Sequence, residues 1–413
     1  MKNLPVLCTL FVFLFSCGSE DPIDDIINNQ TILIESDITE ETIFEDIIDD
    51  PAVADYIVRG YLDIDALLTI DPGVVIAFEA NAVFFVAGIN TTGVLKAIGT
   101  AAEPIVFTGV EKSPGFWRGI SIQSKDVRNE LTHTILEYAG SDFLVQYASV
   151  DVKGGLALNS QSGGFDGGVK LKNSVIRQCL GYGFIVEQFT TIREFSSNTF
   201  SDNEKAAVRI NANNAGMLDA ESNYAGKNGL EGVEINASGS PTHRLTLDAT
   251  WPALKGGAMY FVEQGFDAEA KLTLMPGVTL AFQANQGITF EQDQFGNKDG
   301  ILVANGSSTN PITFTAIDKT PGYWSGLQVQ SNSVLNSLDY CIIEYGGSDN
   351  ISSDKAGNLA LDKNGAFDAP ALSVTNCTIR NSSGCGIIVD TFGGNLTESD
   401  NTFSNNADGN ICM

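Results

Sequence analysis

The chain has 413 residues, of which 23 are Lys or Arg and 51 are Asp or Glu, so its formal net charge is −28. A surface this acidic repels nucleic acid and anionic polymers, so we expect no nucleic-acid partner. The 42 glycines, the short apolar runs between turn residues and the near absence of 3.6-residue periodicity indicate an all-β fold with many tight turns.

The first 16 residues have the pattern of a secretory signal. Lys2 precedes an apolar run over residues 4–15, which is too short to cross a bilayer as a helix. The run ends in Leu14-Phe15-Ser16-Cys17-Gly18, which resembles the lipobox of bacterial lipoproteins. This resemblance implies that Cys17 is acylated and becomes the first mature residue, anchored to a membrane through its lipid. The alternative is an ordinary cleaved signal with a chance cysteine.

An acidic segment follows Cys17. Residues 18–21 read Gly-Ser-Glu-Asp, and no Lys or Arg occurs from residue 18 to residue 57. This start looks like the acidic export signal of Bacteroidetes lipoproteins, which implies a lipid-anchored protein exposed on the outer face of the outer membrane. We expect residues 17–34 to form a solvated tether between the anchor and the folded part.

The rest of the chain repeats itself once. Five sequence blocks recur in the same order, about 205 residues apart, which predicts two tandem units over residues 35–242 and 243–413. The matched blocks are 68–78 with 272–282, 104–108 with 311–315, 114–119 with 321–326, 135–142 with 342–349, and 198–203 with 401–406.

Within each unit, runs of three to six alternating apolar residues are separated by Gly, Asn, Asp or Pro. Strands this short cannot enclose a core as isolated hairpins, whereas stacked coils bury their inward side chains on one another. The pattern therefore predicts a right-handed parallel β-helix, a solenoid, with a β-sandwich as the main alternative. We expect Asn173, Asn198, Asn376 and Asn401 at the bends, where their amides can bond neighbouring backbone.

The cysteines carry little chemistry. No CxxC spacing occurs, so a zinc site is not indicated. We expect Cys179, Cys341 and Cys377 to lie inside the coils as small apolar residues. A disulfide between Cys377 and Cys385 is an open alternative.

The order of these blocks resembles the right-handed parallel β-helix repeat lipoproteins of Bacteroidetes. The resemblance covers about 370 residues, carried by LTI-x-PG-V, PI-x-FT, W-x-G-I, IEY-x-GSD and NTF-x-x-N. It implies the pectate-lyase-like fold, and it adds little about activity because such folds carry many functions.

Each unit has an acidic pair at a strand end. Glu137 is followed by Asp142, and Glu344 by Asp349. Such a pair could hold calcium or act as the two carboxylates of a glycosidase, although solvated surface carboxylates are the more ordinary interpretation.

Other catalytic candidates are weaker. A lyase needs a base beside its calcium, and Arg177 and Arg380 recur at matching positions, which favours a structural role over catalysis. The two histidines, His133 and His243, lie in no motif typical of a general base.

Aromatic pairs follow the Pro-Gly turn in each unit. Exposed aromatic faces stack on sugar rings, so Phe116, Trp117, Tyr323 and Trp324 are the ligand-binding candidates. The alternative is that each tryptophan packs on a neighbouring turn.

The sequence thus favours a surface-anchored β-helix lipoprotein that binds a glycan or a protein, or mediates adhesion, without catalysis. The enzyme alternative is a calcium-dependent polysaccharide lyase or glycoside hydrolase of the same fold. No cofactor other than calcium is indicated.

Overall fold

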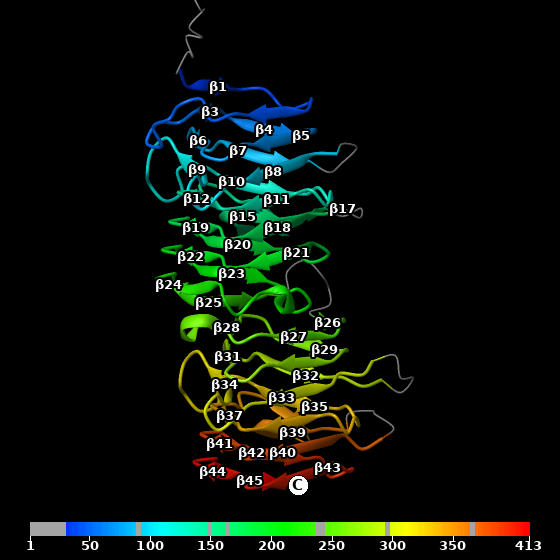
Figure 1. The fold of residues 1–413 in the computed structure, drawn as a ribbon. Coiled ribbons are helices and arrows are strands. Elements are labelled where there is room, and N and C mark those ends of the chain that lie inside the picture. The colour runs from blue at the N-terminus through cyan, green and yellow to red at the C-terminus, as the bar shows by residue number, and fades with distance from the viewer. Residues whose placement is uncertain are drawn as a thin grey trace, which may run out of the picture.

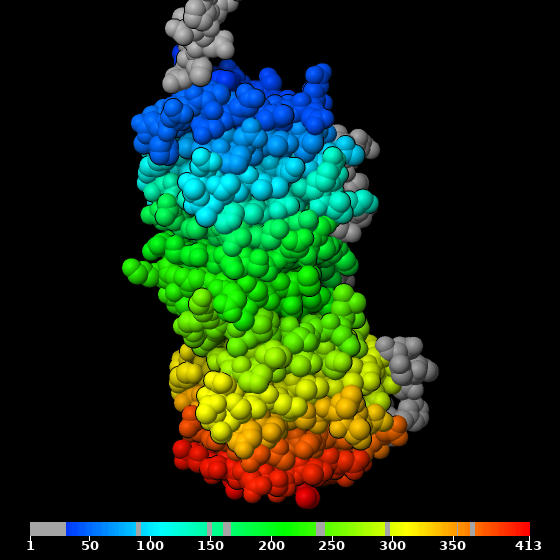
Figure 2. All heavy atoms as spheres, in the orientation of Figure 1, coloured from blue at the N-terminus to red at the C-terminus, as the bar shows by residue number. Residues whose placement is uncertain are grey.

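The computed structural model describes residues 30–87, 92–147, 150–161, 165–236, 244–293, 298–352, 354–363 and 368–413. These residues form a column of short parallel strands, with β1 at one end and β45 at the other (Figures 1 and 2). The described part contains no α-helix, only two 3₁₀ turns, η1 (Ala215–Met217) and η2 (Lys255–Gly257). Residues 1–29, including the predicted signal, the lipidation residue Cys17 and most of the tether, lie outside the described residues.

Three sheets wrap the first part of the column (Figure 1). Sheet I has eight strands: β1 (Ile32–Ile34), β3 (Tyr56–Val58), β6 (Val75–Phe78), β9 (Ile105–Gly109), β12 (Thr134–Glu137), β19 (Val175–Arg177), β22 (Thr199–Ser201) and β24 (Asn223–Gly226). Sheet II has 13 strands: β4 (Tyr61–Ile64), β7 (Val83–Val86), β10 (Gly119–Ile122), β15 (Gly154–Leu158), β20 (Tyr182–Val186), β23 (Ala206–Ile210), β25 (Leu230–Ile235), β28 (Met259–Val262), β31 (Thr279–Phe282), β34 (Ile312–Ala316), β37 (Cys341–Glu344), β41 (Thr378–Arg380) and β44 (Thr402–Ser404). Sheet III has six strands: β2 (Thr42–Phe44), β5 (Leu67–Ile70), β8 (Val94–Ile98), β11 (Glu130–Thr132), β18 (Gly168–Lys172) and β21 (Thr191–Ser196).

Two further sheets join sheet II in the second part of the column. Sheet IV has eight strands: β26 (Arg244–Leu245), β29 (Phe266–Ala268), β32 (Gly287–Phe290), β35 (Gly326–Val329), β38 (Asn350–Ser352), β39 (Lys355–Leu361), β42 (Cys385–Val389) and β45 (Gly409–Cys412). Sheet V has six strands: β27 (Ala249–Trp251), β30 (Leu272–Leu274), β33 (Leu302–Asn305), β36 (Ser337–Asp339), β40 (Ala371–Thr375) and β43 (Asn395–Ser399). Two small antiparallel pairs project from the coils: β13 (Val145–Tyr147) with β14 (Val150–Val152), and β16 (Ser160–Gln161) with β17 (Phe165–Asp166).

The interior consists of side-chain stacks that follow the strand pairing. Because side chains alternate across a strand, every second residue points into the coil and lies over its register partner about 4.8 Å away. In sheet II one such stack is continuous from Leu62 to Phe403, and all of its members are buried except the last, Phe403, which is partly exposed. Its members are Leu62, Phe84, Ile120, Leu156, Phe184, Val208, Val233, Tyr260, Leu280, Phe314, Ile343, Ile379 and Phe403.

Asparagines bond the coils to one another at the bends, as predicted. Asn198 Oδ1 accepts the Ser174 N–H at 3.1 Å, and Asn198 Nδ2 donates to the carbonyl of Leu171 at 2.9 Å. Asn401 makes the equivalent pair of bonds, to the Cys377 N–H and the Val374 carbonyl. Asn173 and Asn376 adopt φ values of 50° and 54°, a left-handed conformation that asparagine tolerates well.

The matched blocks lie in different sheets in the two halves of the column. The strand after the Pro-Gly turn is β6 in sheet I, but its counterpart β31 lies in sheet II. In the same way β7 of sheet II corresponds to β32 of sheet IV, and β8 of sheet III to β33 of sheet V. Matched blocks therefore join different sheets in the two halves, which the sequence alignment alone did not indicate.

The change of sheets occurs where only sheet II continues from one half to the other. Sheet I ends at β24 and sheet III at β21, whereas β25 of sheet II pairs directly with β28. The two 3₁₀ turns lie at this junction, η1 against β27 and η2 against β24. The predicted unit boundary at residues 242 and 243 falls outside the described residues, together with His243, so the two-unit organisation stays a prediction.

The fold itself is the predicted right-handed parallel β-helix, and the β-sandwich alternative is wrong. All strand pairs of the five large sheets are parallel except β38 with β39. A sandwich would pair its strands in antiparallel fashion.

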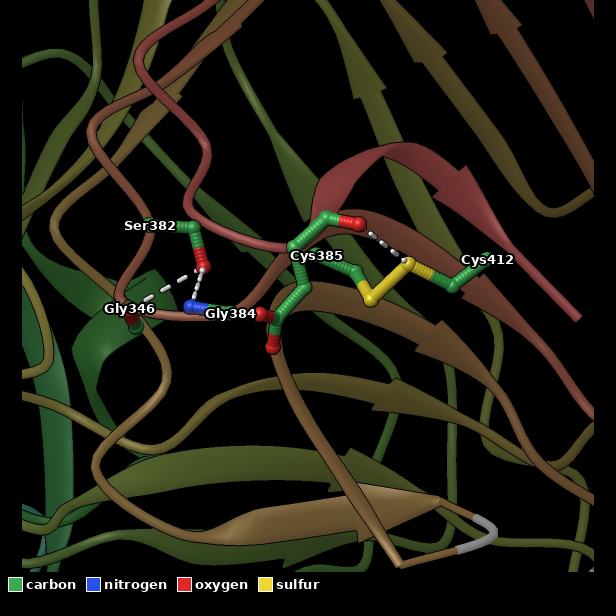
Figure 3. The surroundings of a disulfide bond; sticks show 6 residues. Gly346, Ser382, Gly384, Cys385 and Cys412 are labelled. Carbon is green, nitrogen blue, oxygen red and sulfur yellow. Dashed lines mark hydrogen bonds between the residues drawn. A yellow bond between two sulfur atoms is a disulfide. The ribbon is translucent and has the colours of Figure 1, made fainter.

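The open disulfide prediction is wrong. Cys385 is bonded to Cys412, which joins the neighbouring strands β42 and β45 (Figure 3). Cys377 cannot reach Cys385 in this fold because it precedes β41 in sheet II, whereas Cys385 begins β42 in sheet IV. Cys179, Cys341 and Cys377 are free and buried, as predicted.

Candidate ligand-binding site

The two predicted sugar-stacking tryptophans lie inside the column. Trp117 is 0 % exposed, stacks on Phe78 with ring centroids 3.9 Å apart, and donates its Nε1–H to the Glu137 carbonyl at 2.8 Å. Trp324 is also 0 % exposed and makes the same contacts, with Phe282 and the Glu344 carbonyl. The prediction that these indoles offer a face to a sugar is therefore wrong, and the packing alternative holds.

Their neighbours Phe116 and Tyr323 are partly buried. Both rings pack against the apolar interior. The Tyr323 hydroxyl donates to Gln283 Oε1 at 3.0 Å at the surface. Most of each ring face is thus occupied by the protein itself.

The predicted acidic residue Glu137 is buried instead of solvated. Its side chain is bound by Arg177, whose Nε and Nη2 donate to Oε2 at 2.8 and 2.7 Å. The hydroxyl of Thr108 donates to Oε1 at 2.9 Å, and Lys112 donates to that hydroxyl. All of these hydrogen bonds join residues of the coil wall to one another, which confirms a structural role for Arg177.

The same arrangement recurs around Glu344. Arg380 Nε and Nη2 both lie 2.7 Å from Glu344 Oε2, and Thr315 donates to Oε1 at 2.9 Å. Lys319 donates to the Thr315 hydroxyl, as Lys112 donates to the Thr108 hydroxyl. Arg380 is therefore structural as well.

The remaining predicted acids do not complete a metal site. Asp142 is half exposed and lies 4.0 Å from an Arg118 nitrogen, and Asp349 is exposed. Among the described residues no group of three or more His, Cys, Asp or Glu side chains could hold a metal ion. The calcium prediction thus has no supporting cluster in this part of the chain.

A groove lies on the outer face of sheet IV instead, across β29, β32 and β35. It has a volume of about 360 Å³. Its floor is glycine: a Cβ on Gly287 would lie 2.3 Å from Ser325 Oγ and 2.5 Å from the Gly326 carbonyl. The lining residues are Arg244, Gly265, Phe266, Asp267, Asn285, Gln286, Gly287, Ile288, Thr289, Ser325, Gly326, Gln328 and Ile351.

Asp267 presents a carboxylate to this groove. It points outward from β29, between the inward residues Phe266 and Ala268, and no donor in the described part of the chain bonds to it. Burial raises the pKa of Asp267, repulsion from Glu291 adds to the rise, and Arg244 opposes it. A half-buried carboxylate with free lone pairs is a strong acceptor for a ligand donor.

Two neutral side chains flank the carboxylate in register. Thr289 on β32 pairs with Asp267 on one side and with Gln328 of β35 on the other. The Thr289 hydroxyl donates to Gln328 Oε1 at 3.2 Å, and Gln328 Nε2 donates at 2.7 Å to both Asp362 and the Ile351 carbonyl. These bonds hold the glutamine amide in one orientation.

The charged rim of the groove is already neutralised. Arg244 pairs with Glu269, and Lys298 bridges Glu269 at 2.9 Å and Glu291. Asp267 is therefore the carboxylate left available for a ligand in this part of sheet IV.

The matching face in the first half of the column is filled. Asp63, Phe85 and Ser121 of sheet II occupy the positions of Asp267, Thr289 and Gln328. Phe85 stacks on Tyr61 with centroids 5.6 Å apart, and Ser121 is buried. Aromatic packing thus takes the space that is open in sheet IV.

A second polar cluster lies on sheet II near the junction. Arg209 contacts Glu187 at 3.4 Å and Glu234 at 3.3 Å, and the Tyr182 hydroxyl donates to Glu234 at 2.7 Å. Burial raises the pKa of Glu234 to about 7, and the nearby carboxylate of Glu263 adds to the rise. The cluster is closed to a ligand because Glu187, Arg209 and Glu234 are all buried.

One comparison with known proteins finds a match. The family model for a pectate-lyase-like β-helix domain matches residues 43–149, which corresponds to the strands from β2 to β13. The long parallel sheets of the structure agree with this family match. The chain is a parallel β-helix repeat protein. No curated protein and no solved structure matches it.

The groove residues of this β-helix protein were missed by sequence reasoning. Asp267, Thr289 and Gln328 are single polar residues in strands of alternating pattern. Ordinary surface positions show the same pattern, so these residues do not stand out in the sequence. The available signal was a comparison of the two predicted units, in which Phe85 and Thr289 hold equivalent positions but differ in character. No helix in the described part of the protein is long and apolar enough to cross a membrane.

Proposed function

We propose that this β-helix protein binds a glycan, without catalysis, in the groove on sheet IV. The observation that carries the proposal is the half-buried, unshared carboxylate of Asp267 above a glycine floor. A sugar presents adjacent hydroxyl groups, and carboxylate and amide side chains bind such groups through paired hydrogen bonds. The glycine floor lets a flat ring approach the backbone closely.

The ligand should be neutral. The net charge of −28 disfavours polyuronates and other polyanions. Thr289, Gln328, Asn285 and Ser325 supply uncharged hydrogen-bonding groups around Asp267.

The enzyme alternative has less support. Glycosidases place two carboxyl groups about 5 to 10 Å apart on either side of the scissile bond. Glu269 and Glu291, whose negative charges both act on Asp267, are bound by Arg244 and Lys298. Neither is free to act as the second carboxylate.

The binding test compares Asp267→Asn with Asp63→Asn, the matching position on sheet II. Calorimetric titration with neutral oligosaccharides should show roughly tenfold to hundredfold weaker binding for Asp267→Asn, because a charged acceptor is lost, and no change for Asp63→Asn. Equal affinities for both variants and the unaltered protein, or binding of a protein ligand alone, would contradict the proposal.

We also propose that the protein is a lipoprotein held at the outer membrane and exposed on the cell surface. The lipobox-like residues around Cys17 and the acidic stretch after it support this location. Cells fed a labelled fatty acid should label the protein but not its Cys17→Ser variant, and external protease should degrade the protein on intact cells. Label that persists in Cys17→Ser would refute the anchor, and full protection from protease would refute surface exposure.

A further inference from the structure

The outer face of sheet V carries a row of hydroxyl groups. Ser337 of β36 pairs with Ser373 of β40, which pairs with Thr397 of β43. Register partners on adjacent parallel strands lie about 4.8 Å apart, so these side chains form a straight ladder along the column axis. The ladder is uncharged.

A groove of about 440 Å³ includes two rungs of this ladder, Ser373 and Thr397. Asn332 and Asp368 close one side, where the Asn332 amide donates to Asp368 at 2.9 Å. The side chains of Ser373, Asn395 and Thr397 line the floor, and none of them bonds to another residue that the structure describes. Three neighbouring polar groups are thus available to a ligand.

Large apolar side chains border the groove. Val334, which lines it, is 90 % exposed, and Leu335 is 57 % exposed. Phe392 is 80 % exposed and precedes Gly393, where a Cβ would lie 3.7 Å from the groove residue Ala369. Exposed large apolar side chains gathered beside a groove mark an interaction site.

The corresponding face in the first half of the column lacks this character. The outward ladder of sheet III is charged and alternates in sign through Lys96, Glu130, Lys170 and Glu194. Lys170 pairs with Glu194 at 3.2 Å and with Glu130 at 3.8 Å. Glu130, Lys170 and Glu194 thus satisfy one another, so the sheet III face offers fewer free polar groups than the sheet V face.

We infer that the outer face of sheet V is a second binding site, for an extended neutral glycan chain that lies along the column axis. The hydroxyl ladder repeats at a distance similar to the advance of an extended β-linked glycan per sugar, so successive sugars meet successive rungs. Phe392 stacks on a sugar ring at the rim of the groove. Asp368 and the overall negative charge exclude polyanionic chains.

A glycan fits this face better than a protein partner does. The floor offers hydroxyl and amide groups at regular intervals, and its apolar lining residues are the small Ala369 and Ala371 and the buried Leu372. The large exposed apolar side chains Val334, Leu335 and Phe392 lie at its border. A protein interface of ordinary size has its apolar residues at the centre and its polar residues at the rim.

The test uses the full-length protein, titrated calorimetrically with cellohexaose and mannohexaose. Phe392→Ala should weaken binding of at least one hexasaccharide roughly fivefold to tenfold, and Thr397→Val should weaken it as well. The control is Phe189→Ala, because Phe189 holds the matching position beside the charged ladder and is 68 % exposed. All three changes affect exposed side chains, so the thermal midpoints should stay the same.

This site is separate from the sheet IV groove, and the two can be distinguished. Asp267→Asn should leave the component of binding that depends on Phe392 unchanged. The inference is overturned if neither hexasaccharide binds, if Phe392→Ala and Thr397→Val bind as the unaltered protein does, or if Phe189→Ala weakens binding equally. A protein that binds through Phe392 in place of any glycan would also overturn it.

Discussion

At the scale of single residues, the alternation of side chains along a strand did not distinguish solvated carboxylates from buried ones. Glu137 points outward from its strand, as the alternation in the sequence suggests, yet it is only 6 % exposed because Arg177 and Thr108 cover it. The recurrence of Arg177 and Arg380 correctly indicated a structural role. Their partners could not be predicted, because each ion pair joins strands about 40 residues apart.

Arg177→Ala should destabilise the protein. The change leaves the Glu137 carboxylate buried without its cation, at a cost of about 2 kcal/mol after allowance for the partial exposure of the arginine. A lower urea midpoint would show this cost. Arg59→Ala removes an exposed arginine that also contacts two glutamates and is the matched control. An equal fall in both variants would contradict the buried-pair account.

Glu234 should make stability depend on pH. Its pKa is about 7 in the folded protein against 4.5 when exposed, so the folded state binds more protons between these values. Stability from this group therefore falls as the pH rises from 4.5 to 7. Glu234→Gln should remove this part of the pH dependence and raise stability at pH 8 by roughly 2–3 kcal/mol.

Thermal unfolding at pH 5 and pH 8 would measure the effect of Glu234→Gln. Glu204→Gln, on an exposed turn, is the matched control. If Glu234→Gln were less stable than the unaltered protein at pH 8, the ionised carboxylate would be stabilising and this account would be wrong.

Strands and bends were the most predictable elements. The short alternating runs between turn residues became strands, and Asn198 and Asn401 bond the bends as expected. The disulfide was not predictable, because Cys385 and Cys412 become neighbours only once β45 is stacked on β42. The same holds for Trp117 and Trp324, whose sequence context fits a surface turn as well as a buried stack.

Loss of the disulfide should loosen the last coil. The bond closes a loop of 27 residues and fastens β45, which has no strand beyond it in the structure, to β42. Cys412→Ser should lower stability by about 2–4 kcal/mol and speed hydrogen exchange in β45. Exchange in β6 and β7 should stay unchanged, since coils contact only their neighbours. Uniformly faster exchange along the column would contradict this local role.

At the scale of the whole molecule, the parallel β-helix could be predicted, but the change of sheets between its halves could not. The matched blocks predict coils of the same kind in both halves. The sheet that each block joins depends instead on the pairing of β28 with β25 at the junction. Equivalent faces of the two halves differ in chemistry, with packed or ion-paired faces first and open polar faces second.

The central claim is that ligand binding belongs to the open faces of the second half. Hydrogen–deuterium exchange of the protein with and without a bound neutral oligosaccharide tests it most directly. We expect slower exchange in peptides over β29, β32 and β35 of sheet IV, or over β40 and β43 of sheet V, and no change over β4, β7 and β10. Protection confined to the first half, or none anywhere in a complex shown to form, would contradict the account.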